Sequence, residues 1–226
     1  MKTGLMPRAE LELDRFALDP YCKLYLPLWK LDGNSFMSKD AYGHLCTNYG
    51  SIWIPHGRSF DGVDDYVKII TNILKNQKVS VEAWVKTTNT GGTTITYENG
   101  NAYYGWRSEV TTEGYAAFVV VTSTGLTAAS VVSLISVIDN NWHHIVATDY
   151  ETTLRIYIDG NLNNSASSAT KVWDTTMYVY MGARRPEAAT ALSWYDGLIS
   201  EVRIYSRALT PQEILDHYII GKEMFG

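Results

Sequence analysis

Two adjacent histidines, His143 and His144, most directly suggest chemistry, because imidazoles bind metals and transfer protons. They lie in a run of alternating apolar residues typical of a β-strand, where successive side chains point to opposite faces. Histidines on one strand need a spacing of two to bind one ion, so this pair cannot chelate together. The other histidines, at positions 44, 56 and 217, have no ligand-like neighbour in the sequence. We therefore expect one packed and one surface histidine.

Paired carboxylates would be the signature of a glycosidase. A retaining enzyme needs two carboxyl groups about 5 Å apart, which alternate positions on one strand supply. Glu82 and Glu201 each stand alone in their predicted strands, and Glu109 and Glu113 lie in a stretch with the character of an exposed turn. The sequence also lacks a G-x-S-x-G motif, an H-E-x-x-H motif and a phosphate-binding loop. We predict that the protein is not an enzyme.

Composition and charge exclude further classes of partner. The 226 residues carry a net charge of −5 and no run of lysine or arginine, which excludes nucleic acid as the main partner. No apolar stretch approaches the ~18 residues of a membrane span. The first residues also lack the apolar core of a secretory signal. Cys22 and Cys46 leave open either one disulfide or two buried thiols.

Short β-strands must position most of the functional side chains. The stretch over 79–85 alternates cleanly, so its four apolar residues share one face. Asp159-Gly160 predicts a tight hairpin turn between two further strands. One helix is expected near the end of the chain, where Thr210 and Glu213 form a capping box and Pro211 suits the first turn. These features predict an all-β, two-sheet antiparallel sandwich with one short C-terminal helix.

The chain divides into three parts. Residues 1–20 contain "AELELD", whose alternating apolar and acidic residues indicate either an extended N-terminal arm or a frayed terminus. Residues 21–220 form one domain without repeats or linkers, and residues 221–226 form a short tail.

Five motifs carry a family resemblance. They are "SFDGVDDYVKI", "VSVEAWVKT", "WHHIVATDYETTLRIYIDGNL", "YMGAR" and "YDGLISEVRIYSRALTPQEILDHY". In this order and spacing they resemble the laminin G-like, or concanavalin A-like, jelly-roll domains of the lectin/glucanase superfamily, over about residues 22–220. The resemblance implies two curved antiparallel sheets, the concave one often forming the ligand groove. The superfamily includes lectins, adhesion modules, glucanases and virion components, so the fold does not set the function.

The resemblance also implies residues for a structural Ca²⁺ ion, although no cofactor is required. Many relatives bind this ion between a loop near the F-D-G turn and the closing strand, with oxygen ligands. The matching residues here are Asp61, Asp64, Asp65, Asp196 and Glu201. Relatives often have an aspartate where Ser200 stands, which weakens the match. Alternatively, the aspartates support a turn by hydrogen bonds to the backbone.

Two groups of residues suit a glycan, which aromatic faces bind with help from amide and carboxylate groups. One group surrounds a predicted hairpin and the other precedes the closing strand; together they comprise Tyr97, Asn99, Asn101, Tyr104, Trp106, Arg107, Trp194 and Tyr195. The alternative is that these aromatic residues fill the core, as is common in strands.

We predict a non-catalytic recognition or adhesion module that binds glycans and is displayed on an extracellular surface or a particle. The first alternative is a structural, virion-associated protein that assembles through residues 1–20, since arms often add to a neighbour's sheet. A glucanase-like hydrolase is the third and least favoured alternative. The resemblance implies that glucanases of this superfamily carry an E-x-D-x-(x)-E run, which this chain lacks.

Overall fold

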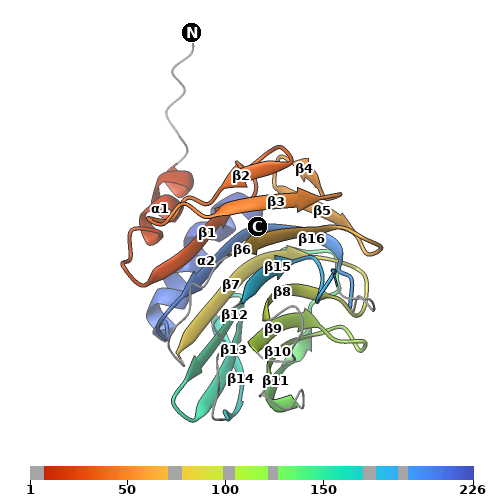
Figure 1. Cartoon of the computed structure of the whole chain (residues 1–226). Coiled ribbons are helices and arrows are strands. Elements are labelled where there is room, and N and C mark those ends of the chain that lie inside the picture. Colours follow the sequence, from red (N-terminus) through yellow and green to blue (C-terminus); the bar gives the residue numbers. More distant parts are fainter. Residues whose placement is uncertain (1–7, 71–77, 99–104, 122–126, 170–176, 188–192) are drawn as a thin grey trace.

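The computed structural model describes residues 8–70, 78–98, 105–121, 127–169, 177–187 and 193–226. Within these ranges the chain forms two antiparallel sheets, sheet A and sheet B, and two helices (Figure 1). The predicted all-β jelly-roll sandwich is confirmed. No helix in the described part is both long and apolar enough to cross a membrane.

Sheet A contains eight strands. They are β1 (Cys22–Pro27), β4 (Ile52–Ile54), β5 (Gly57–Asp61), β7 (Val79–Lys86), β12 (His143–Tyr150), β13 (Thr153–Ile158), β14 (Asn161–Ser167) and β16 (Asp196–Tyr205). Their order is β14-β13-β12-β7-β16-β5-β4, and β1 also pairs with β16. The predicted turn at Asp159-Gly160 joins β13 to β14, and both residues have the positive φ that this turn requires (52° and 77°).

Sheet B also contains eight strands. They are β2 (Ser35–Met37), β3 (Leu45–Tyr49), β6 (Tyr66–Ile70), β8 (Thr93–Glu98), β9 (Gly105–Val110), β10 (Tyr115–Val121), β11 (Thr127–Ser136) and β15 (Tyr178–Met181). Their order is β11-β10-β9-β8-β15-β6-β3-β2. Each sheet therefore has an inner face toward its partner and an outer face away from it.

The core lies between the inner faces. The alternation over 79–85 is confirmed, because Val79, Val81, Ala83 and Val85 of β7 all enter this core from sheet A. Tyr97 and Trp106 enter it from sheet B, with their rings 5.8 Å apart. Cys22 and Cys46 lie on different sheets as free, buried thiols, and burial raises the pKa of each to about 12.

Helix α2 (Pro211–Phe225) begins at the predicted cap. The Thr210 hydroxyl accepts a hydrogen bond from the Glu213 backbone at 3.3 Å, and the Glu213 carboxylate accepts one from the Thr210 backbone at 2.7 Å. The helix continues further than predicted, so residues 221–225 are helical rather than a separate tail. The ring of Phe225 packs against Trp84 and Trp142, which anchors the last turn of the helix.

Helix α1 (Arg8–Phe16) corrects a prediction, because this part of the N-terminal segment is helical rather than an extended arm. Leu13 and Ala17 are buried, and Phe16 packs against the same layer of side chains. Their i, i+3, i+4 spacing is helical, and the alternation of "AELELD" concealed it. The two helices contact each other and lie together outside sheet A (Figure 1).

Candidate functional site

The acidic turn between β5 and β6 gathers three of the five predicted calcium ligands. Carboxylate oxygens of Asp61, Asp64 and Asp65 lie within 4.8 Å of one another. Asp61 also accepts hydrogen bonds from the backbone of Val63 and Asp64, which lower its pKa, while burial raises the pKa of Asp65. These oxygens are donors that Ca²⁺ takes, so the three residues fit the predicted ion, which remains a prediction.

The other two predicted ligands lie in different places. Asp196 is paired with Asp61 in the register of β16 and β5, so it borders the acidic turn. Glu201 lies on the outer face of sheet A, buried and paired with Arg203. Glu201 therefore does not belong to the acidic turn, because it lies further along β16 and already neutralises an arginine.

Most of the predicted sugar-binding aromatic residues turn out to be core residues. Tyr97, Trp106 and Tyr195 are fully buried, so their rings are not open to a sugar. This corrects the prediction for them, since strand parity shows which residues share a face but not which face is inner. Trp194 and Arg107 are partly exposed. The predicted positions 99, 101 and 104 lie outside the described residues.

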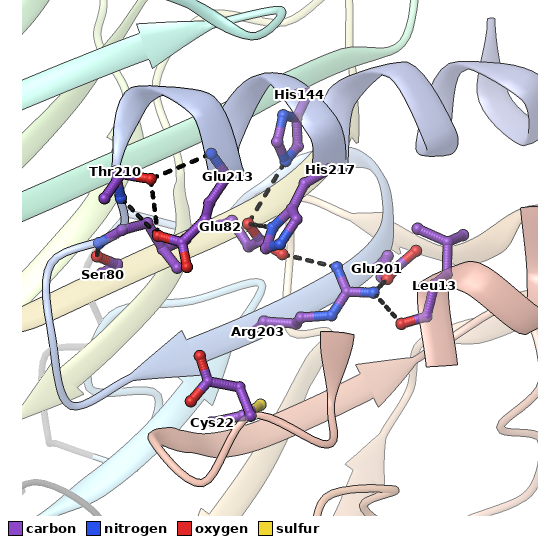
Figure 2. Close-up of polar contacts among 12 residues, drawn as sticks. Leu13, Cys22, Ser80, Glu82, His144, Glu201, Arg203, Thr210, Glu213 and His217 are labelled. Carbon is purple, nitrogen blue, oxygen red and sulfur yellow. Dashed lines mark hydrogen bonds and ion pairs between the residues drawn. The ribbon is translucent and has the colours of Figure 1, made fainter. Parts of the chain in front are cut away.

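A buried charge cluster joins sheet A to both helices (Figure 2). Its centre is Glu82 on β7, whose two carboxylate oxygens accept from Arg203 at 2.6 Å and from His217 of α2 at 2.8 Å. His144 approaches the second oxygen at 3.7 Å, and Arg203 also donates to the backbone oxygen of Leu13 in α1 at 2.8 Å. Glu82 stands alone in its strand and His217 has no ligand-like neighbour in the sequence, so only the fold brings these two residues together.

Electrostatics explains how this cluster is tolerated. Burial opposes the ionisation of Glu82, but the charges of His217 and Arg203 outweigh it and hold the pKa of Glu82 well below its usual value. Burial lowers the pKa of His144, which favours the neutral ring. Glu82, His144 and Arg203 are about 1% exposed and His217 is 5% exposed. The arrangement fastens α1 and α2 to the sheet.

His143 lies on the opposite side of its strand, as parity predicted, but it is not a surface residue. Its ring is buried and its two nitrogens lie 2.9 Å from Asp159 and 3.0 Å from Asp139. The hydrogen bond with Asp159 raises the pKa of His143. Through these two contacts, His143 connects the β13–β14 turn with the turn before β12.

The outer face of sheet B carries a different kind of surface. Alternation in β3, β6 and β15 points a set of aromatic side chains outward, and Trp194 joins them from the loop before β16. We call this set the aromatic patch: Tyr49, Tyr66, Tyr178, Tyr180 and Trp194. Among the described residues, no helix lies over this face.

Tyr66 is the centre of the aromatic patch. Its ring stacks on Tyr49 with centroids 4.3 Å apart and contacts Tyr180 and Trp194 at 6.2 and 6.3 Å. Tyr49 is 40% exposed and Tyr66, Tyr178 and Trp194 are partly exposed, while Tyr180 is buried. The patch therefore offers aromatic side chains to a partner without opening the core.

Charged side chains border the aromatic patch. Lys68 lies 4.9 Å above the ring of Tyr178 and pairs with Glu187 at 2.6 Å. Glu187 also accepts a hydrogen bond from the Tyr180 hydroxyl at 3.3 Å. Aromatic rings beside hydrogen-bonding groups suit ligands with one apolar and one polar side.

Sequence reasoning found Trp194 but missed the rest of the aromatic patch. The tyrosines come from β3, β6 and β15, which are far apart in the sequence and meet only through the pairing of Tyr49 with Tyr66 and of Lys68 with Tyr180. The sequence feature that could have revealed part of the patch is the alternation of tyrosine with apolar residues in "TTMYVYMGAR".

Comparisons with known proteins agree with this fold. A family model described as the concanavalin A-like lectin/glucanases superfamily matches residues 61–215. The receptor binding domain of botulinum neurotoxin D superposes with a TM-score of 0.68 at 16% identity, covering 89% of this chain and 53% of that one. The botulinum neurotoxin type G receptor binding domain gives 0.66 at 17% identity, covering 88% and 51%.

A third structure is the binding domain of botulinum neurotoxin DC in complex with SialylT, with a TM-score of 0.68, 14% identity and coverage of 88% and 51%. The chain thus spans about half the length of these structures, and identities this low show a shared fold. Curated proteins give no match. Since the family model covers well over half of the chain, the protein belongs to the concanavalin A-like lectin/glucanase superfamily.

Proposed function

We propose that the protein is a non-catalytic recognition module that binds glycans through the outer face of sheet B. The observation that carries the proposal is the contrast between the two outer faces. Helices α1 and α2 cover the outer face of sheet A, whereas that of sheet B presents the aromatic patch. A glycan-binding module of this kind acts where glycans are displayed, on an extracellular surface or a particle.

The chemistry of the aromatic patch supports a sugar ligand. A pyranose ring has apolar C–H faces and hydroxyl groups at its edge, so it requires aromatic surface next to polar groups. Tyr66 and Trp194 supply the aromatic surface, and Lys68 and Glu187 supply the polar groups. The names of the similar structures, which are receptor binding domains, agree with a binding role.

Two alternatives receive less support. Assembly through residues 1–20 would require this segment to be free for a neighbour, but Leu13 is buried against the chain's own aromatic residues. Hydrolysis would require two accessible carboxylates, but Glu82 and Glu201 are buried with Arg203 between them. We therefore place neither role ahead of binding.

A glycan array tests the proposal directly. Tyr66→Ala and Trp194→Ala should each reduce binding at least about tenfold, since aromatic contacts dominate many interfaces. Tyr42→Ala is the matched control, because Tyr42 is an exposed tyrosine outside the aromatic patch. Melting temperatures of all variants show whether they are folded. If the parent protein ignores the whole array, or if only Tyr42→Ala weakens binding, the proposal fails.

A further inference from the structure

One carboxylate, that of Glu187, lies beside the central rings of the aromatic patch. Glu187 lies in the loop after β15, and its Oε2 accepts a hydrogen bond from the Tyr180 hydroxyl group at 3.3 Å. The rings of Tyr66 and Tyr178 contact that of Tyr180, with centroids 6.2 and 5.9 Å away. A ligand that covers these rings therefore comes close to the carboxylate of Glu187.

Two local features bring Glu187 to this place. Tyr180 of β15 is paired with Lys68 of β6, so both side chains leave the same face of sheet B next to each other. Directly after β15, Gly182 has a φ of 83°, and a side chain at this position would collide with the ring of Phe60. The chain therefore turns sharply at Gly182, and the loop that follows brings Glu187 back to Tyr180 and Lys68.

Two donors fix the orientation of the Glu187 carboxylate. Lys68 donates to Oε1 at 2.7 Å and to Oε2 at 2.6 Å, and the Tyr180 hydroxyl group also donates to Oε2. Burial raises the pKa of Tyr180, so its hydroxyl group stays protonated and continues to donate. A group that is held in place before its ligand arrives loses little conformational entropy on binding.

One acceptor site of Glu187 remains for a ligand. An ionised carboxylate accepts about four hydrogen bonds, about two at each oxygen. Among the described residues, Oε2 accepts two and Oε1 accepts one, so the remaining site is on Oε1. The side chain of Glu187 is 40% exposed, whereas that of Lys68 is only 16% exposed. A ligand on the rings therefore meets the carboxylate more readily than the ammonium group.

This geometry selects the polar groups of the ligand. An ionised carboxylate accepts hydrogen bonds and donates none, so it pairs with a hydroxyl group and repels a carboxylate or sulfate group. Lys68 does not reverse this selection, because Glu187 already compensates its charge. Two exposed carboxylates, those of Asp61 and Asp64, precede Tyr66 in the acidic turn and add to the negative potential at this end of the patch.

We infer that Glu187 is a specificity-determining residue, which accepts a hydrogen bond from one hydroxyl group of the sugar and makes the aromatic patch selective for neutral over acidic sugars. This inference rests on the proposed glycan-binding function and narrows its ligand class. Tyr180 is a positioning residue, because it is buried and reaches the ligand only through Glu187.

The first test compares matched oligosaccharides, with glucose against glucuronic acid and with a free against a sulfated hydroxyl group. EDTA is present, so that no divalent cation masks the acidic turn. The parent protein should bind the neutral members at least about tenfold more tightly, because like charges repel at an interface. Added salt should reduce this difference.

Glu187→Gln keeps the length of the side chain but removes its charge, so it should remove most of the difference between neutral and acidic members. Glu223→Gln is the matched control, because Glu223 is an exposed glutamate on α2, and it should keep the full difference. Melting temperatures show whether each variant is folded.

The second test identifies the hydroxyl group by comparing the tightest neutral ligand with derivatives that each lack one hydroxyl group. One derivative should bind the parent protein at least about tenfold more weakly, as expected for a hydrogen bond to a charged group. Glu187→Ala should bind this derivative and the intact ligand equally. Tyr180→Phe should weaken binding of the intact ligand in the parent protein but not in Glu187→Ala, because it acts through Glu187.

The outcomes separate the two proposals. Equal binding of neutral and acidic members, or a preference for acidic ones, would overturn the role of Glu187, and loss of that binding in Tyr66→Ala would leave the glycan function standing. A selectivity that survives Glu187→Gln, or the absence of any hydroxyl group whose contribution depends on Glu187, would also overturn the role of Glu187. Absence of binding to every member would overturn both proposals.

Discussion

At the scale of single residues, we expect Glu82 to contribute most to stability. It holds Arg203 and His217 at once, and through them it fixes both helices. We expect Glu82→Gln to lower the free energy of unfolding by about 3–5 kcal/mol, because it breaks two buried ion pairs at once. Arg203 keeps Glu201 as a second carboxylate, but His217 loses the one with which it pairs. Urea unfolding monitored by tryptophan fluorescence measures this change.

Glu12→Gln provides the control for Glu82→Gln. Glu12 pairs with Arg15 at 3.0 Å on the exposed surface of α1. Surface pairs contribute at most about 1 kcal/mol, so this variant should stay close to the parent protein. Similar small losses in both variants would show that the buried cluster does not hold the helices.

His143 predicts a pH dependence at the same scale. Its pKa is raised in the folded protein, mainly by the hydrogen bond with Asp159. The stabilisation is therefore complete below the unfolded value of about 6.5 and is lost as the pH rises through the higher folded value. Unfolding free energies of the parent and His143→Gln should thus differ more at pH 6 than at pH 8.5. A difference that grows with pH would contradict this assignment.

At the scale of elements, α1 is the least expected feature and the one most open to test. Leu13 is buried between α1 and sheet A, whereas Leu18, in the turn after α1, is 79% exposed. Leu13→Ala should lower the free energy of unfolding by about 2–5 kcal/mol, as for other buried leucines. Leu18→Ala should change it by at most about 0.5 kcal/mol. Equal effects in denaturant titrations would mean that α1 does not pack as described.

The elements also show how far sequence reasoning reaches. The β7 strand, the Asp159-Gly160 turn and the cap at Thr210 were predictable, because each depends on local spacing or on one turn type. Helix α1 was not, since only its packing on sheet A reveals which of its residues are buried. Periodicity in a short segment does not decide between strand and helix.

At the scale of the whole molecule, the fold was predictable and the site was not. Ordered motifs identified the superfamily, because they reflect strands and turns along the chain. The aromatic patch depends on cross-strand pairing, such as that of Tyr49 with Tyr66 and of Lys68 with Tyr180. Trp106 shows the opposite error, since a surface aromatic residue and a core one look alike in sequence.

The measurement that most directly tests the account is hydrogen–deuterium exchange with and without the tightest glycan from the array. Ligand on the outer face of sheet B should slow exchange in β3, β6 and β15, because binding stabilises the strands that carry the aromatic patch. Exchange in α1, α2 and β1 should change little. Protection confined to the helices and β1 would place the ligand on the other side of the molecule and contradict the account.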